Sequence, residues 1–258
     1  MVATMEENLR HQISKLRSRL REAEEKVRVN DCLATVGMTA ATLAHEIANS
    51  LQWIFAMVQW MQRDLSEHQA TGGKIPQNEQ LELIYKEIKR LRSMLREFHS
   101  LARPVHLNIA AVAVRDLIAE VEKIVLPESE SVGVRVEHHI SRSLPLIKID
   151  AEKLKQVFFN LYKNAIEAMP SGGKLVVKAY PEAENLMIEI RDTGVGIPEG
   201  VDIFRPFATT KEHGTGLGLM VVKQIVTAHG GAISCRSKKR KGTTFRIVLP
   251  LSTGAQSG

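Results

Sequence analysis

The chain has 258 residues, 44% of them hydrophobic, and a formal net charge of +6 at pH 7. This composition suits a globular protein with one large domain or two ordinary ones, and it excludes a disordered or fibrous chain. No apolar run is long enough to cross a bilayer and residues 1–10 lack a signal-peptide pattern, so we expect a cytoplasmic protein or the soluble part of a longer chain.

Two features that could indicate a metal or a nucleic acid have simpler explanations. Cys32 and Cys235 lie far apart and have no companion Cys or His at metal-ligand spacing, which favours structural thiols in a reducing compartment. The basic run Arg236–Lys241 stands between two strand-like stretches and has no aromatic residues interleaved with it. A solvated hairpin tip explains this run better than a nucleic-acid patch, so we expect no nucleic-acid partner.

Residues 1–30 have the periodicity of a helix with one apolar seam. The apolar residues recur every three or four positions among charged and polar ones; they are Leu9, Ile13, Leu16, Leu20, Ala23 and Val27. Such a heptad seam predicts a coiled coil, here the N-terminal element of the chain. Because its end has few large residues, it would form only a weak dimer by itself.

Two longer amphipathic stretches follow, joined by a polar loop at Thr71–Pro76. The first covers about residues 31–67, and the second carries an apolar stripe from Leu81 to Phe98 and closes at Pro104. Two such helices form an antiparallel hairpin. One hairpin cannot bury both stripes, whereas hairpins from two chains can do so as a four-helix bundle. We therefore predict that residues 31–104 form a homodimerisation element.

Residues 108–250 alternate between helical and strand-like patterns. Helices are expected over Val114–Leu126, from the N-cap Asp150 to Met169 and over Thr215–His229, and strands over Val132–Ile140, Lys174–Tyr180, Asn185–Asp192, Ala232–Arg236 and Thr243–Leu249. The strands come in adjacent pairs between helices, which favours a mixed sheet with helices on one face. The fold class is therefore α+β with two domains: the hairpin, then a two-layer α/β sandwich over residues 108–250. Residues 251–258 are expected to be a flexible tail.

Two glycine-rich clusters in the second domain suit a phosphate-bearing ligand. Asp192 ends a strand and is followed by Gly194 and Gly196, so a buried carboxylate beside a tight turn can accept a hydrogen bond from an exocyclic amine. The segment Gly214–Leu219 has glycine at alternate positions and opens a helix, whose free N–H groups attract an anion. Either cluster alone is also compatible with an ordinary turn.

A third cluster lies on one face of the predicted helix from Asp150. Asn160, Lys163 and Asn164 share this face with Glu167. Amide oxygens suit Mg²⁺ or its waters and a lysine suits phosphate, although a solvated helix face is the simpler alternative. A fourth, poorly periodic segment, Ile203–His213, has the character of a lid whose Thr209, Thr210 and Lys211 could reach phosphates.

Together, the order and spacing of these clusters resemble the nucleotide-binding boxes of the histidine kinase branch of the ATPase superfamily that includes gyrase and Hsp90. The stretch Asn160–Ala168 looks like the family's N box, and Pro206–Lys211 followed by Gly214–Leu219 is similar to the nitrogen-regulatory type of kinase. The resemblance implies a Bergerat-type fold that binds ATP with Mg²⁺. The segment Glu199–Phe204 is shorter than in the family, which implies a trimmed lid helix.

The resemblance also implies roles for single residues. Asp192 would bind the adenine amine, Asn164 would ligate Mg²⁺, and Asn160 and Lys163 would assist at the metal and the phosphates. The other residues predicted at the nucleotide are Gly194, Gly196, Thr209, Thr210, Lys211, Gly214, Thr215, Gly216, Leu217 and Gly218.

His45 is the candidate phosphoryl acceptor on the first long helix. Its neighbours Leu43 and Ile47 fit the apolar stripe, so the imidazole is expected to point towards solvent. A neutral ring can attack a γ-phosphoryl group in line, and the carboxylate of Glu46 can hold one ring nitrogen and take its proton. An ordinary surface His-Glu pair is the alternative.

The stretch Leu43–Leu51 resembles the family's H box. This implies that His45 is the phosphoacceptor and Glu46 the base, and that Asn49 orients a hydrolytic water when the kinase acts as a phosphatase. Ala48 stands where the family has Arg or Lys, and Ser50 where it has a Pro that bends the helix. We therefore expect a straighter helix and an altered balance between the two activities.

The sequence thus predicts the core of a two-component sensor histidine kinase. The core would be the soluble part of a longer sensor, or it would sense through a partner or through the coiled coil itself. It would phosphorylate His45 from ATP and pass the phosphoryl group to the receiver domain of a response regulator. One alternative is an ATP-binding, phosphatase-biased scaffold with weak autokinase activity. Another keeps the ATPase fold without phosphotransfer. Trp53 and Trp60, seven residues apart, fit either a receiver-docking surface or packing between subunits.

Overall fold

The computed structural model describes residues 12, 15–16, 19, 37, 39–64, 77–102, 105–209 and 214–251. Most of the predicted coiled coil, the loop Thr71–Pro76 and all but the first residue of the predicted tail lie outside the described residues, as do Thr210 and Lys211. By its internal contacts the chain divides into two compact units, Met1–Pro104 and Val105–Gly258.

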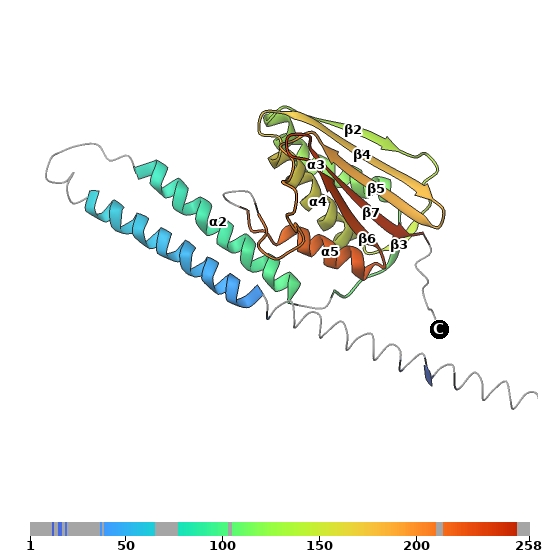
Figure 1. The fold of residues 1–258 in the computed structure, drawn as a ribbon, viewed down its shortest axis with the longest axis horizontal. Coiled ribbons are helices and arrows are strands. Elements are labelled where there is room, and N and C mark those ends of the chain that lie inside the picture. Colours follow the sequence, from blue (N-terminus) through green and yellow to red (C-terminus); the bar gives the residue numbers. More distant parts are fainter. Residues whose placement is uncertain are drawn as a thin grey trace, which may run out of the picture. The chain divides into compact units, whose positions relative to one another are not determined.

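The first unit contains two helices that lie side by side (Figure 1). Residues 39–64 are helical without interruption, through Ser50, and α2 spans Gln77–Leu101. Glu46 contacts Arg90 while Ser50 contacts Glu87, so positions that increase along one helix decrease along the other. The two helices are therefore antiparallel, as the hairpin prediction requires.

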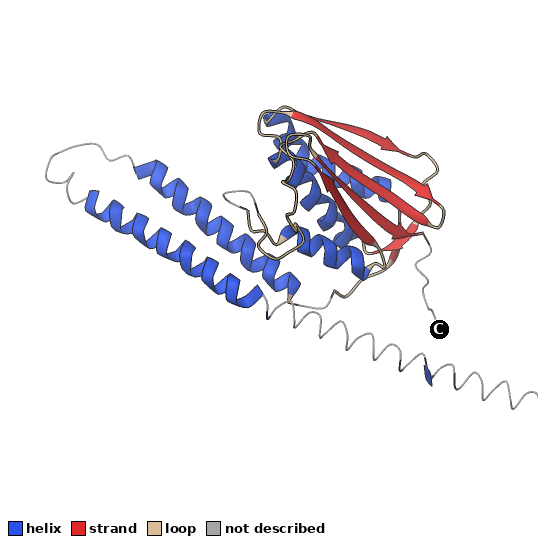
Figure 2. Cartoon of the chain, viewed as in Figure 1, coloured by secondary structure: helices blue, strands red, loops and turns tan. Residues whose placement is uncertain are grey.

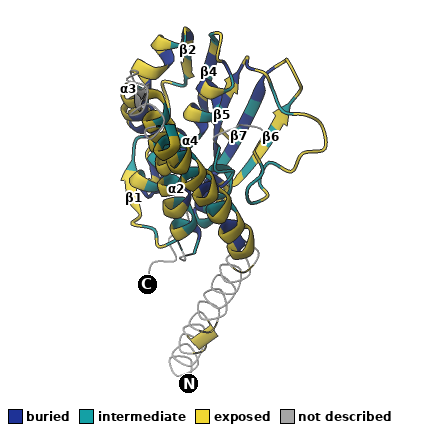
Figure 3. Ribbon diagram, turned by 90° about the vertical axis from the view of Figure 1, so that its left-hand side faces the viewer, coloured by how far each residue is buried: buried dark blue, intermediate teal, exposed yellow. Residues whose placement is uncertain are grey.

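The predicted apolar stripes are only partly covered within one hairpin. Among the described residues of this unit, the buried side chains are Thr39, Leu43, Ser50, Met94 and Leu101. Several residues of the predicted stripes are instead exposed, among them Val58, Leu81, Ile88 and Leu95. This exposure agrees with the expectation that one hairpin cannot bury both stripes, and Figure 3 shows exposed residues along α2.

The hairpin keeps a large apolar surface open. Its exposed large hydrophobic side chains are Leu51, Trp53, Phe55, Val58 and Trp60 on residues 39–64, and Leu81, Leu83, Tyr85, Ile88 and Leu95 on α2. Trp53 and Trp60 line one groove of about 400 Å³ together with Ala56, Met57, Gln80 and Leu83. Among the described helices, none combines the length and apolar character needed to cross a bilayer.

The second unit is a mixed five-stranded sheet with helices on one face (Figure 2). In spatial order the strands are β2 (Val134–Ile140), β4 (Gly173–Glu182), β5 (Asn185–Asp192), β7 (Thr243–Pro250) and β6 (Ala232–Ser237). Only the β2–β4 pair is parallel. The helices are α3 (Val114–Ser131), α4 (Ala151–Glu167) and α5 (Gly218–Ala228). The predicted two-layer α/β sandwich is confirmed.

The core of this unit lies between the sheet and the helices. Along β7 buried residues alternate with half-buried ones, so that Phe245, Ile247 and Leu249 face inwards. The α4 side chains Leu154, Val157, Phe158 and Leu161 are fully buried against them and their neighbours. Each such side chain stabilises the fold by about 1.5–3 kcal/mol through its removal from water. Two short strands, β1 (Ala110–Val112) and β3 (Ile147–Ile149), form a separate antiparallel pair.

Asp150 fixes the start of α4, as predicted. One of its carboxylate oxygens accepts the backbone N–H of Lys153 at 3.0 Å and the other accepts that of Asn108 at 2.8 Å. Burial opposes the charged form, but these two hydrogen bonds hold the pKa of Asp150 below its usual range. The cap therefore sets where α4 begins, and with it the direction of the face that carries Asn160 and Asn164.

Candidate nucleotide and phosphoacceptor sites

Asp192 is a buried carboxylate at the end of β5, with 4% of its surface exposed. Its Oδ1 accepts the backbone N–H of Gly194 at 2.8 Å and that of Thr243 at 3.1 Å. Two backbone donors from different segments hold the side chain in one orientation. Burial, together with the charge of Asp192, raises the pKa of the Cys235 thiol to about 11, so this cysteine stays a neutral thiol near neutral pH.

The turn after Asp192 is pressed against the end of α4. A Cβ atom at Gly194 would lie 2.4 Å from the carbonyl oxygen of Ala168, which no side chain can tolerate. The backbone N–H of Val195 donates to the same oxygen at 3.0 Å. Gly194 is therefore required by contact with the protein's own backbone, and Gly196, half-buried, continues the same turn.

The amide face of α4 lies where the sequence places it. Asn160 and Asn164 are half-buried. The side chain of Lys163 is 49% exposed, and its Nζ lies 3.7 Å from Glu167 Oε1. Asn160 Nδ2 donates to the carbonyl oxygen of Gly218 at 3.4 Å, which ties the middle of α4 to the first residue of α5. Its Oδ1 is then the atom that can bind a cation.

This donor set fits a hydrated Mg²⁺ carried with a nucleotide. Among the described residues no group of three or more His, Cys, Asp or Glu side chains could hold a metal by itself. Mg²⁺ keeps several waters and is commonly held by one or two protein oxygens plus substrate phosphates. The oxygens of Asn160 and Asn164 would suffice for that mode of binding.

The second glycine cluster precedes α5 and contacts the lid segment. A Cβ at Gly216, where φ is +65°, would lie 2.4 Å from the backbone of Phe207. Leu217 is fully buried, and Thr215 Oγ1 accepts its backbone N–H at 3.4 Å. The helix begins at Gly218, three residues after the predicted start, so Gly214 and Thr215 belong to the preceding loop.

The described part of the lid contacts both α5 and the second glycine cluster. Phe204 lies under the ammonium group of Lys223 on α5, 5.6 Å from the ring centre. Phe207 has a positive φ of 59° where it meets Gly216. Thr209 is exposed. Thus α4 contacts both glycine clusters, one at its end and one at its middle, and brings three of the four predicted clusters together.

His45 and its neighbours in sequence belong to the helix formed by residues 39–64 in the first unit. His45 and Asn49 are exposed, as is Ala48, whereas Glu46 is half-buried. The expected outward direction of His45 agrees with this exposure. Glu46 Oε2 lies 3.2 Å from Arg90 Nη2 on α2.

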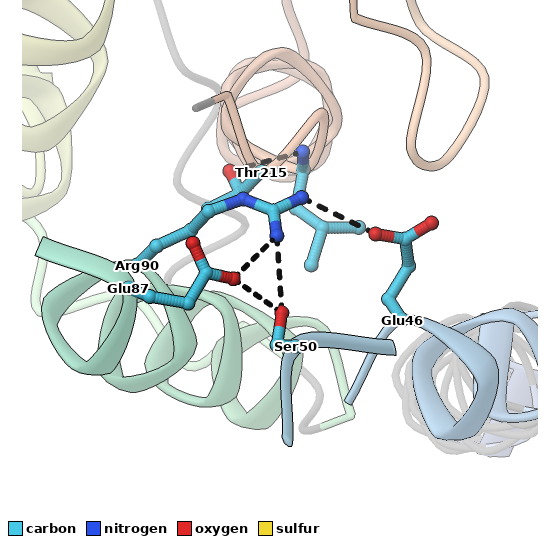
Figure 4. A network of polar contacts seen from close by, with 6 residues as sticks. Glu46, Ser50, Glu87, Arg90 and Thr215 are labelled. Atoms are coloured by element: carbon cyan, nitrogen blue, oxygen red, sulfur yellow. Dashed lines mark hydrogen bonds and ion pairs between the residues drawn. The ribbon is translucent and has the colours of Figure 1, made fainter. Parts of the chain in front are cut away.

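Sequence reasoning missed the polar seam beside Glu46. Ser50 is 3% exposed, and its hydroxyl donates to Glu87 Oε1 and accepts from Arg90 Nη1 (Figure 4). The available signal was a Glu and an Arg three residues apart, inside the helical repeat that also holds Ile84 and Leu91. Without knowledge of how the two helices pair, Glu87 and Arg90 would be interpreted as an ordinary solvent-exposed ion pair.

Comparisons with known proteins agree with this arrangement. Residues 149–253 match the family described as histidine kinase-, DNA gyrase B- and HSP90-like ATPase. Sporulation kinase D of Bacillus subtilis strain 168 is 36% identical over 225 residues, covering 85% of this chain and 43% of the relative. The sensor histidine kinase ZraS of Escherichia coli K12 is 36% identical over 231 residues, covering 89% of this chain and 48% of ZraS.

The fold extends over most of a solved kinase structure. The histidine kinase ThkA, in a crystal structure of its complex with the response regulator protein TrrA, aligns with a TM-score of 0.77 at 24% identity. The alignment covers 92% of this chain and 68% of ThkA. The chain spans about half the length, or less, of the curated relatives it matches.

Proposed function

Because the chain belongs to the two-component sensor histidine kinases, we propose that it is a kinase core that transfers the γ-phosphoryl group of ATP to His45. The observation that carries this proposal is the exposed imidazole of His45 beside the half-buried carboxylate of Glu46. An accessible nucleophile next to a held base is the arrangement that attack on phosphorus requires. Residues 31–104 would be the phosphoacceptor hairpin, residues 108–250 the catalytic domain and residues 1–30 a signalling coiled coil.

In the catalytic domain, Asp192 would accept a hydrogen bond from the adenine amine and so select the base. Lys163, with half its surface exposed, would meet phosphate oxygens, as would Thr209, Thr210 and Lys211. The loop Gly214–Gly218 would present its backbone N–H groups to the phosphates at the start of α5. Mg²⁺, held by Asn164 and Asn160, would neutralise charge on the phosphates.

A homodimer is supported by the surface that the hairpin leaves open. Ten large hydrophobic side chains of residues 39–64 and α2 are exposed, and the groove with Trp53 and Trp60 lies among them. A second copy of the hairpin would bury this surface in a four-helix bundle. The same observation favours subunit packing over receiver docking for Trp53 and Trp60.

The phosphoryl group on His45 would pass to an Asp of a response-regulator receiver domain. This partner is supported by ThkA, whose structure was solved with a response regulator protein. We expect the kinase core to work in the cytoplasm, where ATP is available. Asn49 is exposed one helical turn from His45 and could orient a water for phosphatase activity, the dephosphorylation of the regulator. In the phosphatase-biased alternative, this phosphatase activity would be the main activity of the chain.

Radioactive labelling tests the proposal. The full chain is incubated with Mg²⁺ and ATP labelled at the γ position, and the label is tested for loss in acid and retention in base. We expect such a label, its absence in His45→Gln and its retention in His99→Gln, a matched exposed histidine on α2. Equal labelling of His45→Gln contradicts the acceptor assignment. Little label together with rapid dephosphorylation of a regulator favours the phosphatase-biased alternative.

A further inference from the structure

Four polar side chains meet between the two helices of the hairpin. Glu46 and Ser50 come from residues 39–64, and Glu87 and Arg90 come from α2 (Figure 4). The side chains of Arg90 and Glu87 are 17% and 14% exposed, and Ser50 is 3% exposed. This seam therefore holds one cation and two carboxylates in a place where apolar side chains would be the simpler choice.

The guanidinium of Arg90 forms hydrogen bonds with Ser50 and Glu87 through one nitrogen and with Glu46 through the other. Its Nη1 donates to Glu87 Oε1 at 3.0 Å and to Ser50 Oγ at 3.1 Å. Ser50 also donates to Glu87, so these three groups form a closed triangle. Because the guanidinium is planar and rigid, fixing Nη1 also fixes Nη2, which donates to Glu46 Oε2 at 3.2 Å.

From this geometry we infer that Arg90 is a positioning residue for the phosphorylation of His45, acting through Glu46. The inference rests on the proposed function. Arg90 donates a hydrogen bond to Oε2 of Glu46 and so fixes the orientation of the carboxylate. Oε1 is then the oxygen left to accept the proton of His45. One ring nitrogen of His45 bonds to the γ-phosphorus while the bond from phosphorus to the ADP oxygen breaks, and ADP leaves with that electron pair. The N–H proton of the other ring nitrogen passes to Glu46 Oε1.

Ser50 and Glu87 explain why arginine stands at this position. A lysine ammonium could reach Glu46 or the Ser50–Glu87 pair, but as a point charge it lacks the fork that spans both. Loss of the fork frees the Glu46 carboxylate to turn away from His45. The consequence falls on the chemical step, because none of the four residues belongs to the unit that holds the predicted nucleotide site.

The test makes Arg90→Gln and Arg90→Lys in the 258-residue chain and compares them with Arg92→Gln, which replaces an exposed arginine on the same helix. The initial rate of acid-labile labelling is measured over a range of ATP concentrations. We expect Arg90→Gln to lower the rate at saturating ATP by about tenfold or more with KM for ATP unchanged. Arg90→Lys should recover only part of the rate, and Arg92→Gln should match the parent.

A double-mutant comparison separates positioning from general support of the fold. In the Glu46→Gln background, Arg90→Gln should cause little further loss, because the group through which it acts has already changed. An equal loss in both backgrounds, or a normal rate for Arg90→Gln, overturns the inference. Absence of any label on His45 in the parent chain refutes the proposed function instead.

A smaller change protects the test against misfolding. If thermal unfolding shows that Arg90→Gln is unfolded at the assay temperature, Ser50→Ala replaces it, because that change removes only the hydroxyl that steadies Nη1 and Glu87. We expect Ser50→Ala to lower the saturating rate by a few fold, again at unchanged KM, and to lose this effect in Glu46→Gln. A folded Ser50→Ala variant that labels at the parent rate overturns the inference.

Discussion

Asp192 combines burial with two backbone hydrogen bonds, so its structural role can be separated from its proposed role in binding adenine. In Asp192→Asn the amide oxygen can still accept the N–H groups of Gly194 and Thr243. The amide nitrogen, however, would present a donor to the adenine amine, which is itself a donor. We expect ATP affinity to fall at least about tenfold, equivalent to about 1.4 kcal/mol, while the fold persists.

Calorimetric titration with a non-hydrolysable ATP analogue and thermal unfolding without nucleotide check this prediction. Glu189→Gln is the matched control, because it removes the charge of another carboxylate on the same strand, one that pairs with Arg246. The control should bind nucleotide like the parent chain. A variant Asp192→Asn that is stable and binds with parental affinity would show that the adenine contact lies elsewhere.

His229 ties the end of α5 to the start of α4 through a neutral imidazole. The side chain is 3% exposed, and its Nε2 accepts the backbone N–H of Asp150 at 3.0 Å. The ring proton must then be on Nδ1, which donates to the carbonyl oxygen of Ile225 at 2.8 Å. Burial lowers the pKa of His229 from its ordinary value of 6.5, although Ile225 and Asp150 partly oppose this shift.

This shift predicts a loss of stability in mild acid. Below pH 6.5 the unfolded chain takes up a proton at His229 that the folded chain refuses, so the stabilisation present above this pH declines as the pH falls towards the folded pKa. Denaturant unfolding of the full chain between pH 7.5 and 5.5 measures the slope. His229→Gln should flatten it, whereas His139→Gln, at an exposed position of β2, should leave it unchanged. A parental slope in His229→Gln contradicts the assignment.

At the scale of elements, the sequence predicts best where one periodicity dominates. The strand Asn185–Asp192 has the predicted bounds, because alternation ends at the Asp-Thr-Gly turn. The strands β1 and β3 were missed, since three residues are too few to show a period. Helix α3 continues past Leu126 through Pro127 to Ser131, although proline usually ends a helix.

The hairpin shows a different limit of sequence patterns. Counting apolar residues identifies both helices and includes the buried Leu43. It does not show that Ser50 and Glu87 also lie between the helices while Ile88 and Leu95 are exposed. A helix with two apolar faces produces overlapping stripes, and periodicity alone does not assign each stripe to a neighbour. Arg90 could not be predicted for the same reason, since its role depends on which residues of the other helix it meets.

The exposed stripe of α2 predicts the effect of a charge in the dimer interface. Ile88 and Leu95 are seven residues apart and 48% and 49% exposed. A glutamate at either position would be buried without a partner on association, at a cost of several kcal/mol. We expect light scattering to give the dimer mass for the parent, twice 28.7 kDa, and a monomer mass for the double variant Ile88→Glu with Leu95→Glu at micromolar concentration.

Ile124→Glu supplies the control for that prediction. Ile124 is 64% exposed on α3, outside the hairpin, so a charge there should leave the chain dimeric. A dimer that persists in the double variant, or a parent chain that is already monomeric, contradicts the proposed four-helix bundle. Circular dichroism should show that the double variant keeps its helices, because both side chains point away from the buried seam.

At the scale of the whole molecule, the predicted nucleotide residues belong to one unit and the predicted phosphoacceptor to the other. The sequence identifies both sets because each has its own motif at short spacing. The glycines show what motifs omit. Gly194 and Gly216 are required by the backbone of Ala168 and Phe207, which lie outside the motif to which each glycine belongs. Such contacts depend on the completed fold, so a motif indicates the presence of a site without explaining each of its residues.

The division into two units also predicts how the activity separates. Residues 105–258 contain the whole sheet and the three helices that cover it, so they have a complete core and should fold alone and bind the ATP analogue with the affinity of the full chain. Residues 1–104 should take no label from ATP by themselves. Mixing the two fragments should restore labelling of His45, because positioning in the full chain depends on tethering and not on shared residues.

Tethering makes the dependence on concentration the decisive measurement. A short linker supplies an effective concentration on the order of millimolar, so micromolar fragments should label far more slowly than the full chain. The initial rate should rise in proportion to the concentration of residues 105–258 at a fixed amount of residues 1–104, while the full chain's rate per molecule should not change with dilution as long as it remains dimeric. Fragments that label each other at the rate of the full chain, or a catalytic fragment that does not fold alone, would show that the two units are parts of one cooperative structure.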